Sequence, residues 1–273
     1  MTDNINNLVA KAQIGDKWAL EQLVSEIQDQ VYHLSMRMLV DPEQAMDATQ
    51  EILIILITKL STFEHASKFQ TWVYRVATNY LINSKKAQSR DMGLSFPMFG
   101  QMLETGLDQK AIIDPAPSPD QAVLLNELRI SCTMAMLLCL DLKHRVAYVL
   151  GDILELEHNE AALIIEITPQ NYRKRLSRAR NEVVKFTSLK CGIANDNAKC
   201  SCPARLPDAI KNGRVNASNI AYATVHAPDY VDVLQQVNEV VDELKVFKLQ
   251  NATPNFKPPE DLAAKIKAIV ETA

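Results

Sequence analysis

Apolar residues recur every three or four positions through most of the chain, a spacing that predicts an all-α protein. The first such stretch runs from about residue 8 to 39, with mostly polar residues between the apolar ones. A second helix is predicted over residues 42–60, followed by a loop at 61–68 and a third helix over about 69–87. Asp41 marks the start of the second helix, because its carboxylate can accept a free backbone N–H and the proline after it suits the first turn.

The second half of the chain resumes the helical pattern after an irregular stretch. Residues 88–117 contain several glycines and prolines, which predicts a linker between two domains. Ser118 is a suitable cap for a helix over about 119–140. Further helices are predicted at about residues 144–155, 207–212, 228–248 and 259–271.

Residues 156–185 predict two short helices joined by a tight turn, and the second helix is strongly basic. Thr168 is a good N-cap for that helix, and Pro169 fits its first turn. An apolar stripe follows at helical spacing, formed by Tyr172, Leu176, Ala179 and Val183. This pattern is typical of a helix-turn-helix, whose second helix enters the major groove of DNA. The competing interpretation is a solvated basic helix in an ordinary bundle.

The helix over residues 42–60 changes character along its length. Asp47, Gln50 and Glu51 fall on one face near its start. Residues 52–57 are apolar on all sides, so they must be covered by the rest of the domain or by a partner. A buried central helix is the first expectation, and the polar trio suggests a docking surface.

The helix over residues 69–87 places aromatic side chains among amide and basic ones. Phe69, Trp72 and Tyr80 could stack on unpaired bases, with Asn79 available for hydrogen bonds to a base edge. The alternative is that the aromatic residues belong to the core, and this is the preferred interpretation for Trp72 and Val76.

Composition and charge narrow the function. At 273 residues the chain can hold two or three small domains. A formal net charge of −4 means that nucleic-acid binding must come from local basic patches. With only 7 glycines and no GxGxxG or P-loop motif, nucleotide chemistry has no support. The 5 histidines are scattered without a catalytic motif, so an enzyme is not predicted.

The expected location is the cytoplasm, with no membrane partner. The first residues lack the basic start and apolar core of a secretory signal. The uninterrupted apolar runs are too short to span a membrane. The chain has 5 cysteines, and an odd number fits a reducing compartment better than a disulfide framework.

Three cysteines, Cys191, Cys200 and Cys202, lie close together in the sequence. They could bind zinc or another soft metal, with His226 as the nearest later candidate for a fourth ligand, or they could sense oxidation. Small buried cysteines without such a role are the alternative. Cys132 and Cys139 lie on an apolar helix and are expected in the core.

Two segments carry a family resemblance. Residues 41–60, DPEQAMDATQEILIILITKL, followed by F-x-T-W-V-Y-R-V-A-x-N at 69–79, resemble region 2 of sigma-70-family transcription initiation factors, most closely the extracytoplasmic-function (ECF) group. The pattern L-x-x-x-E-A-A with YRKRLSRAR in residues 156–180 is similar to region 4 of the same family. The expected division is region 2 at 1–90, a flexible linker at 91–117, region 4 at 118–188, and a cysteine-containing helical C-terminal extension at 189–273.

The resemblance implies a bacterial factor that binds core RNA polymerase and directs it to specific promoters, without catalytic activity of its own. The residues that match the polymerase-docking motif of the family are Asp47, Gln50 and Glu51. In the family, region 2 also melts the minus-ten element and captures its nontemplate strand. The matching DNA-binding residues are Asn79, next to the base-holding loop at 61–68, and the phosphate contacts Lys85, Lys86 and Arg90.

Region 4 of the family reads the minus-thirty-five duplex with the second helix of its helix-turn-helix. Thr168, which caps this helix, is itself a candidate DNA contact. The residues nearest the N-terminus of the helix are the candidates for contacts with base edges: Gln170, Asn171, Arg173 and Lys174. The basic residues further along are the candidates for phosphate contacts: Arg175, Arg178 and Arg180.

The implied partners are core RNA polymerase and promoter DNA, together with an anti-sigma factor or self-regulation by the C-terminal extension. No cofactor is required, apart from the zinc option at the cysteines. Two alternatives stay open: a helix-turn-helix regulator that acts without polymerase, and a metal- or redox-responsive sigma factor. The acidic excess of the predicted helix at 228–248 argues against phosphate contacts by the extension.

Overall fold

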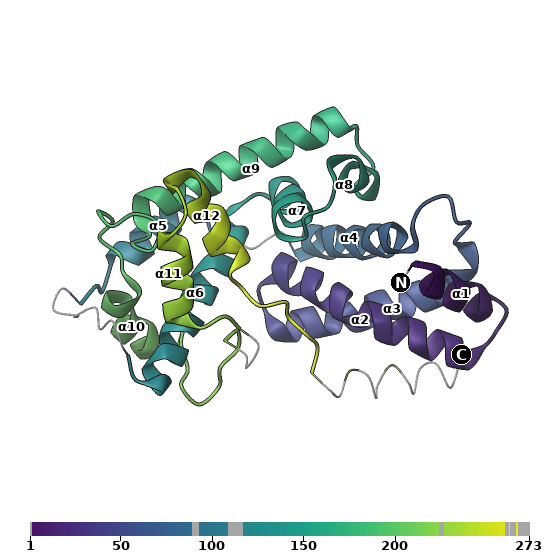
Figure 1. Ribbon diagram of the computed structural model, residues 1–273, viewed down its shortest axis with the longest axis horizontal. Helices are drawn as coiled ribbons and strands as arrows, with labels where there is room; N and C mark the ends of the chain where they lie inside the picture. The colour runs from purple at the N-terminus through teal and green to yellow at the C-terminus, as the bar shows by residue number, and fades with distance from the viewer. Residues whose placement is uncertain are drawn as a thin grey trace. The chain divides into compact units, whose positions relative to one another are not determined.

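The computed structural model describes residues 2–88, 93–108, 117–223, 227–259, 262 and 266. Within these ranges every regular element is a helix, and the extended pairing found there is an isolated parallel β-bridge between Cys191 and Cys200 (Figure 1). The predicted all-α class is therefore confirmed. The chain forms two compact units, each built from separate segments of the sequence. Unit 1 comprises residues 1–91, 156–172 and 256–273, and unit 2 comprises residues 92–155 and 173–255.

Unit 1 is built around helix α2. Its helices are α1 (Thr2–Gln13), α2 (Lys17–Leu39), α3 (Pro42–Thr58), the short 3-10 helix η1 (Leu60–Thr62), α4 (Phe69–Gln88) and α8 (His158–Ile164). The predicted cap is present, since Asp41 Oδ1 accepts the backbone N–H of Gln44 at 2.8 Å and starts α3. Residues 31–39 of α2 are all buried, and α1, α3 and α4 lie against this helix. A helix buried on all sides needs neighbours all round it.

Unit 2 contains the remaining elements. They are α5 (Phe96–Glu104), α6 (Pro119–Cys139), α7 (Leu142–Tyr148), the π-helical turn η2 (Val149–Ile153), most of α9 (Pro169–Lys190), α10 (Cys202–Lys211), α11 (Tyr230–Asn238) and α12 (Asp242–Asn251). The first four residues of α9 group with unit 1.

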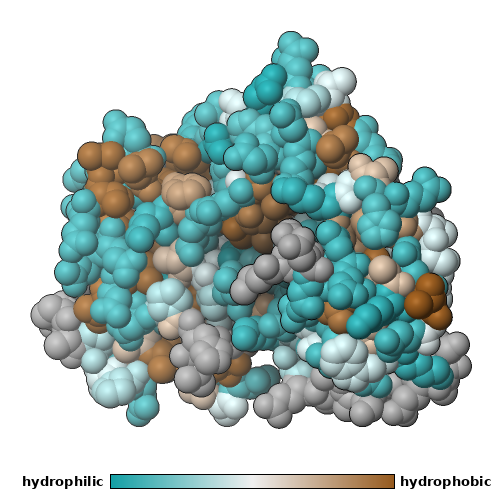
Figure 2. Space-filling model, turned by 45° about the vertical axis from the view of Figure 1, so that its right-hand side comes forward, coloured by the Kyte–Doolittle hydropathy of each residue, from teal (hydrophilic) through white to brown (hydrophobic). Residues whose placement is uncertain are grey.

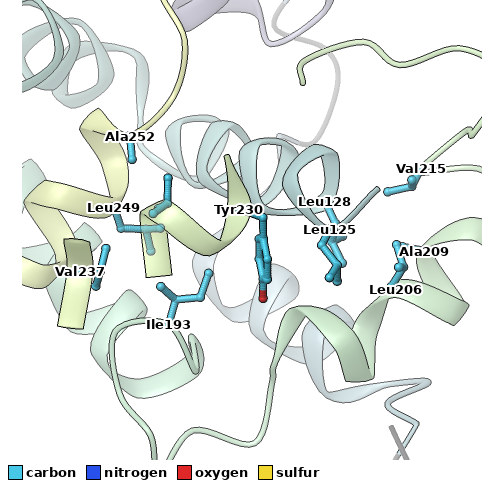
Figure 3. Close-up of a cluster of buried hydrophobic side chains, with 11 residues drawn as sticks. Leu125, Leu128, Ile193, Leu206, Ala209, Val215, Tyr230, Val237, Leu249 and Ala252 are labelled. Carbon is cyan, nitrogen blue, oxygen red and sulfur yellow. The ribbon is translucent and has the colours of Figure 1, made fainter. Parts of the chain in front are cut away.

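Helix α6 forms the centre of unit 2. Among the described helices, it is the only one long and apolar enough, by length and composition, to cross a membrane. In the structure 61% of its most apolar window is buried, and α10 and α11 lie against it. Leu125 and Leu128 of α6 share one core cluster with Tyr230 of α11 and Leu206 of α10 (Figure 3). Residues of the C-terminal extension therefore cover this apolar helix.

Buried polar residues on α6 also hold the extension. The carboxylate of Glu127, which is almost fully buried, accepts the backbone N–H groups of Ala221, Tyr222 and Ala223 at 2.6–2.9 Å. The Asn126 side chain donates to the carbonyl of Pro228 at 2.8 Å. Hydrogen bonds to a buried charged group are each worth about 1.5–3 kcal/mol, so these contacts fix the loop before α11 onto α6.

The structure corrects the predicted helix over residues 228–248, which is two helices. The chain is extended at Val241 (φ −62°, ψ 153°), and this break separates α11 from α12. The apolar spacing continues across the break, which explains the single helix in the prediction, whereas the pair of β-branched valines there lowers the helix propensity. Within the predicted linker, residues 96–104 form helix α5. The helix expected at 259–271 lies mostly outside the described residues.

Some apolar side chains of α12 and its N-cap are exposed. In the space-filling view, hydrophobic residues emerge in patches between hydrophilic ones (Figure 2). Val241, Leu244 and Phe247, each 41% exposed or more, are spaced three residues apart, whereas Val246 and Leu249 are buried. Helix α12 therefore packs with one face and leaves a second apolar face uncovered within unit 2.

Candidate nucleic-acid interface

The predicted helix-turn-helix is present in residues 158–190. Helix α8 ends at Ile164, and the turn is closed by the backbone N–H of Ile167, which donates to the carbonyl of Ala162 at 3.1 Å. The Thr168 hydroxyl accepts the backbone N–H of Asn171 at 3.3 Å and caps α9, as predicted. Glu166 in the turn has a left-handed backbone (φ 54°), a conformation that glycine adopts more easily. The turn is therefore held by backbone and cap hydrogen bonds rather than by its residue type.

The two faces of α9 differ as the sequence predicts. Tyr172, Leu176, Ala179 and Val183 are at most 1% exposed and form the buried stripe. Most of the candidate DNA contacts are exposed: Thr168, Gln170, Asn171, Arg173, Lys174, Arg178 and Arg180, with Arg175 half-buried. This leaves a polar and basic surface along the helix, which suits the phosphates and base edges of a duplex.

One of these basic residues has a structural partner. Both oxygens of the buried Asp152 carboxylate accept hydrogen bonds from the Arg180 guanidinium, with Nε–O distances of 2.9 and 2.8 Å. The one acidic residue of α9 is Glu182, whose Oε1 lies 3.8 Å from Nδ1 of His144. Arg180 thus anchors α9 to η2, although its side chain is 48% exposed.

Helix α8 also packs against α4 within unit 1. The Thr71 hydroxyl of α4 donates to Glu160 Oε1 of α8 at 2.7 Å. Burial, together with a smaller effect of the Glu160 charge, raises the pKa of Tyr74 on α4 to about 12. A hollow of about 590 Å³ is lined by Arg75 of α4, Ala162 and Leu163 of α8, and Asn171 of α9. No sequence pattern predicts this pairing, because 89 residues separate Thr71 from Glu160.

The predicted polymerase-docking residues lie on α3 as expected. Asp47 and Glu51 are exposed, and Gln50 is half-buried. Burial, followed by the charges of Glu51 and Asp47, raises the pKa of Tyr80 on α4. The acidic face of α3 is therefore next to α4.

Asn79 lies on the same side of α4. It is exposed and lines a hollow of about 350 Å³ together with Ile55 and Lys59 of α3 and Tyr80 and Asn83 of α4. The seam between α3 and α4 thus brings the candidate strand-reading residue beside Ile55 and Lys59 of α3, the helix that carries the candidate docking residues. The side chains of Lys85 and Lys86, and the whole of Arg90, lie outside the described residues.

The loop at residues 61–68 is anchored by an aromatic cluster. The Phe63 ring is buried, and its centroid lies 5.4 Å from that of Phe69 and 5.5 Å from that of Trp72. The Gln13 side chain of α1 donates to the carbonyls of Leu60 and Phe63, at 3.0 Å each. Phe69 is a core residue, and the half-buried Trp72 packs beside it, as the core interpretation predicts. Sequence reasoning missed Gln13, whose amide has no local signal for this role.

The cysteines lie together in unit 2. Cys132 of α6 joins Cys191, Cys200 and Cys202 around a cavity of about 30 Å³. The backbone is close here as well: Gly192 N–H donates to the Cys200 carbonyl at 2.8 Å, and a side chain at this glycine would come within 2.7 Å of that oxygen. The fourth cysteine, Cys132, is predicted from the sequence only as a core residue, so its position beside the other three is a finding of the structure.

The structure gives no support to the zinc expectation. In the described parts of the chain, no group of three or more His, Cys, Asp or Glu side chains is placed to hold a metal ion. The candidate ligand His226 lies outside these parts. Burial is the main cause that raises the pKa of all four thiols, to about 12 for Cys132 and about 11 for Cys200. High thiol pKa values are typical of inert, structural cysteines rather than of redox sensors.

These pKa values predict slow alkylation. A thiol with a pKa near 11 is only about 0.1% ionised at pH 8, so iodoacetamide should modify Cys200 at least ~100-fold more slowly than a free cysteine. Mass spectrometry of the labelled peptides measures the rates, with the urea-unfolded chain as the control. The rate in the folded protein should rise about tenfold per pH unit up to pH 10. Equal rates in the folded and unfolded chain at pH 8 would contradict the burial of these thiols.

Comparison with known proteins places this geometry in a family. The family model for sigma-70 region 2 matches residues 23–91, which extend from α2 through α4. The chain is 30% identical over 181 residues to the ECF RNA polymerase sigma factor SigW of Bacillus subtilis, covering 66% of this chain and 95% of SigW. It is also 30% identical over 185 residues to the ECF RNA polymerase sigma-E factor of Escherichia coli K12, covering 67% of this chain and 93% of that protein.

These matches define the protein as a sigma-70-family factor, a class that acts in transcription initiation and is regulatory rather than enzymatic. Within that family, the chain belongs to the ECF group. Among solved structures, the chain is similar to CnrH in complex with the cytosolic domain of CnrY, with a TM-score of 0.46 and 20% identity, covering 67% of this chain and 94% of CnrH.

Proposed function

We propose that this ECF factor recruits core RNA polymerase through α3, opens the minus-ten element with α4, and reads the minus-thirty-five duplex with α9. The observation that carries the proposal is the exposed polar and basic face of α9 opposite a fully buried apolar stripe. Family membership is the reason to expect core RNA polymerase and promoter DNA as partners. The anti-sigma factor expected from the resemblance stays a prediction.

Polymerase docking is assigned to Asp47, Gln50 and Glu51. The exposure of Asp47 and Glu51 on one side of α3, with Gln50 half-buried, supports the assignment, because docking residues must be accessible and must act together. Acids on an interface rim mainly steer and orient the partner, whereas desolvated acids contribute more to affinity. A DNA-binding regulator that acts without polymerase would not need these three residues.

Strand capture is assigned to the surface around Asn79. The seam hollow beside this residue and the anchored loop at 61–68 offer space and a firm support for an unpaired base. Flipping a base out of the stack costs a few kcal/mol, which stacking and pocket contacts can offset. Lys85, Lys86 and Arg90 are proposed to bind the backbone of the captured strand.

Duplex recognition is assigned to the N-terminal part of α9. Gln170, Asn171, Arg173 and Lys174 are all exposed there and are proposed to contact base edges. Arg175 and Arg178 are proposed to contact phosphates. Arg180 is a weaker candidate for a phosphate contact, because its guanidinium is already paired with Asp152.

The two kinds of contact predict different effects of substitution. Lys174→Ala should relax the sequence preference, because a good base contact is worth about 1–3 kcal/mol of discrimination. Arg178→Ala should weaken all duplexes alike and make binding less dependent on salt. The measurement is binding to matched and mismatched duplexes over a salt series, using a site selected from randomised DNA. Equal effects of the two substitutions on discrimination would contradict the assignment.

The docking assignment predicts a loss of polymerase binding without a loss of DNA binding. The double variant Asp47→Ala/Glu51→Ala should bind core polymerase at least about tenfold more weakly, a change of ~1.4 kcal/mol. Duplex binding by α9 should be unchanged. The control is Glu43→Ala, an exposed acid in the first turn of the same helix. If the double variant and the control bind polymerase equally well, the docking surface lies elsewhere.

A further inference from the structure

The turn between α1 and α2 exposes two large apolar side chains. Ile14 is 86% exposed and Trp18 is 61% exposed, whereas Ala19, the next residue of α2, is fully buried. A single apolar residue on a surface is ordinary, but an exposed tryptophan offers a large, flat ring for contact. Two such residues four positions apart therefore make this turn a candidate contact surface of unit 1.

Local hydrogen bonds fix the position of Trp18. The Asp16 backbone N–H donates to the Lys11 carbonyl at 3.1 Å, and Gly15 between them has a left-handed backbone (φ 92°), which closes the turn. Asp16 Oδ1 then accepts the backbone N–H of Ala19 at 3.0 Å and caps α2. Trp18 thus belongs to the first turn of a capped helix, and the backbone that carries its ring is held in place.

The same turn is attached to the loop at 61–68. Gln13, the last residue of α1, donates its side-chain amide to the carbonyls of Leu60 and Phe63 at 3.0 Å each. Trp18 follows Gln13 by five residue steps, so their Cα atoms are at most about 18 Å apart. At about 3.4 Å per nucleotide, a strand bound at this loop covers that distance in roughly five nucleotides.

This surface continues to the proposed site of strand capture. Lys59, which precedes η1, lines the hollow of about 350 Å³ together with Asn79. The 3-10 helix η1 begins at the next residue, Leu60, whose carbonyl is one of the two acceptors of the Gln13 amide. The surface around Trp18 and the hollow around Asn79 are therefore joined through η1 and Gln13.

The charge of these segments suits a nucleic-acid strand. Residues 11–18 and 59–68 carry four lysines and two acids, and all four lysines are exposed: Lys11, Lys17, Lys59 and Lys68. One of the two acids, Asp16, already accepts the Ala19 N–H. Unpaired bases stack on aromatic side chains and lysines bind backbone phosphates, so an exposed tryptophan among lysines fits single-stranded DNA.

We propose that Trp18 is a stacking platform for a further unpaired base of the captured strand, a few nucleotides from the base held beside Asn79. The inference rests on the proposed function, because the loop and the hollow hold the strand that reaches Trp18. Every base has a flat face, so this contact adds affinity and little sequence preference. The contact forms only when the strand is unpaired, so it favours the open promoter over the closed duplex.

An abasic scan of the strand tests the platform. The full-length chain, assembled with core RNA polymerase, is titrated with nontemplate-strand oligonucleotides from a promoter selected out of randomised DNA, each lacking one base. With the natural chain, removal of one base other than that held beside Asn79 should weaken binding about fivefold or more. Trp18→Ala should bind the intact strand about fivefold more weakly, and removal of that same base should have no further effect. Trp18→Phe should restore most of the affinity.

The matched control is Val241→Ala, which shortens an apolar residue of similar exposure, 63%, in unit 2. This variant should bind every oligonucleotide as the natural chain does. The platform is overturned if Trp18→Ala has the affinity and the scan of the natural chain, or if it weakens all oligonucleotides without changing the scan. It is also overturned if Trp18→Ala weakens only the binding of core polymerase, because the turn is then a protein contact.

A failure of the proposed function gives a different result. Asn79→Ala should remove the response to loss of the captured base and keep the response at the Trp18 position. If neither Asn79→Ala nor Trp18→Ala changes binding, and no abasic site does, this surface captures no strand. That outcome would overturn the proposed strand capture, and the platform with it.

Discussion

The burial of α6 is the constraint on which unit 2 depends. This helix is apolar enough to resemble a membrane span, and in water its surface must be covered by other protein elements. The cover comes from the extension, through α10, α11 and the apolar cluster around Tyr230. Glu127 and Asn126 add directional contacts with the same extension. The extension is therefore part of the core that carries α9, and not an appendage to a finished domain.

The same kind of constraint acts in unit 1, where residues 31–39 of α2 are all buried. Helices α1, α3 and α4 lie against α2, and the Phe256 ring covers a further part of its surface at His33. The two cores bury mainly apolar side chains, with charged exceptions that include Arg37, Glu127 and Asp152, and leave most charged residues outside. Asp47 and Glu51 of α3 and the basic residues of α9 are exposed as a result. The surfaces proposed to bind polymerase and DNA consist of polar and charged residues that lie outside these two cores.

Local patterns predicted local features well. The stripe through Tyr172 and Val183, and the Thr168 cap, depend only on neighbours within a few residues, and each is present as predicted. The break at Val241 was missed because the apolar spacing runs straight through it. Short-range periodicity reports the spacing of apolar residues, and it does not reveal a break after which Val246 and Leu249 are buried while Leu244 and Phe247 are exposed.

The long-range contacts could not be predicted from the sequence. The hydrogen bonds of Thr71 with Glu160 and of His33 with Phe256 join residues 89 and 223 positions apart. The grouping of Cys132 with the three later cysteines is of the same kind. Such pairs depend on how whole helices pack, and a threonine or histidine has the same local pattern with or without its partner. The roles proposed for α3, α4 and α9 come from the family resemblance, and the exposure of their side chains comes from the structure.

The most direct test of this account is native-state hydrogen exchange of the full-length chain in increasing urea. If the extension completes the core around α6, the amides of α6, α10 and α11 should open together, with the same free energy and the same dependence on urea. If α10 and α11 instead open at a clearly lower free energy while α6 keeps its protection, the extension is a separate, dispensable layer, and the account is contradicted.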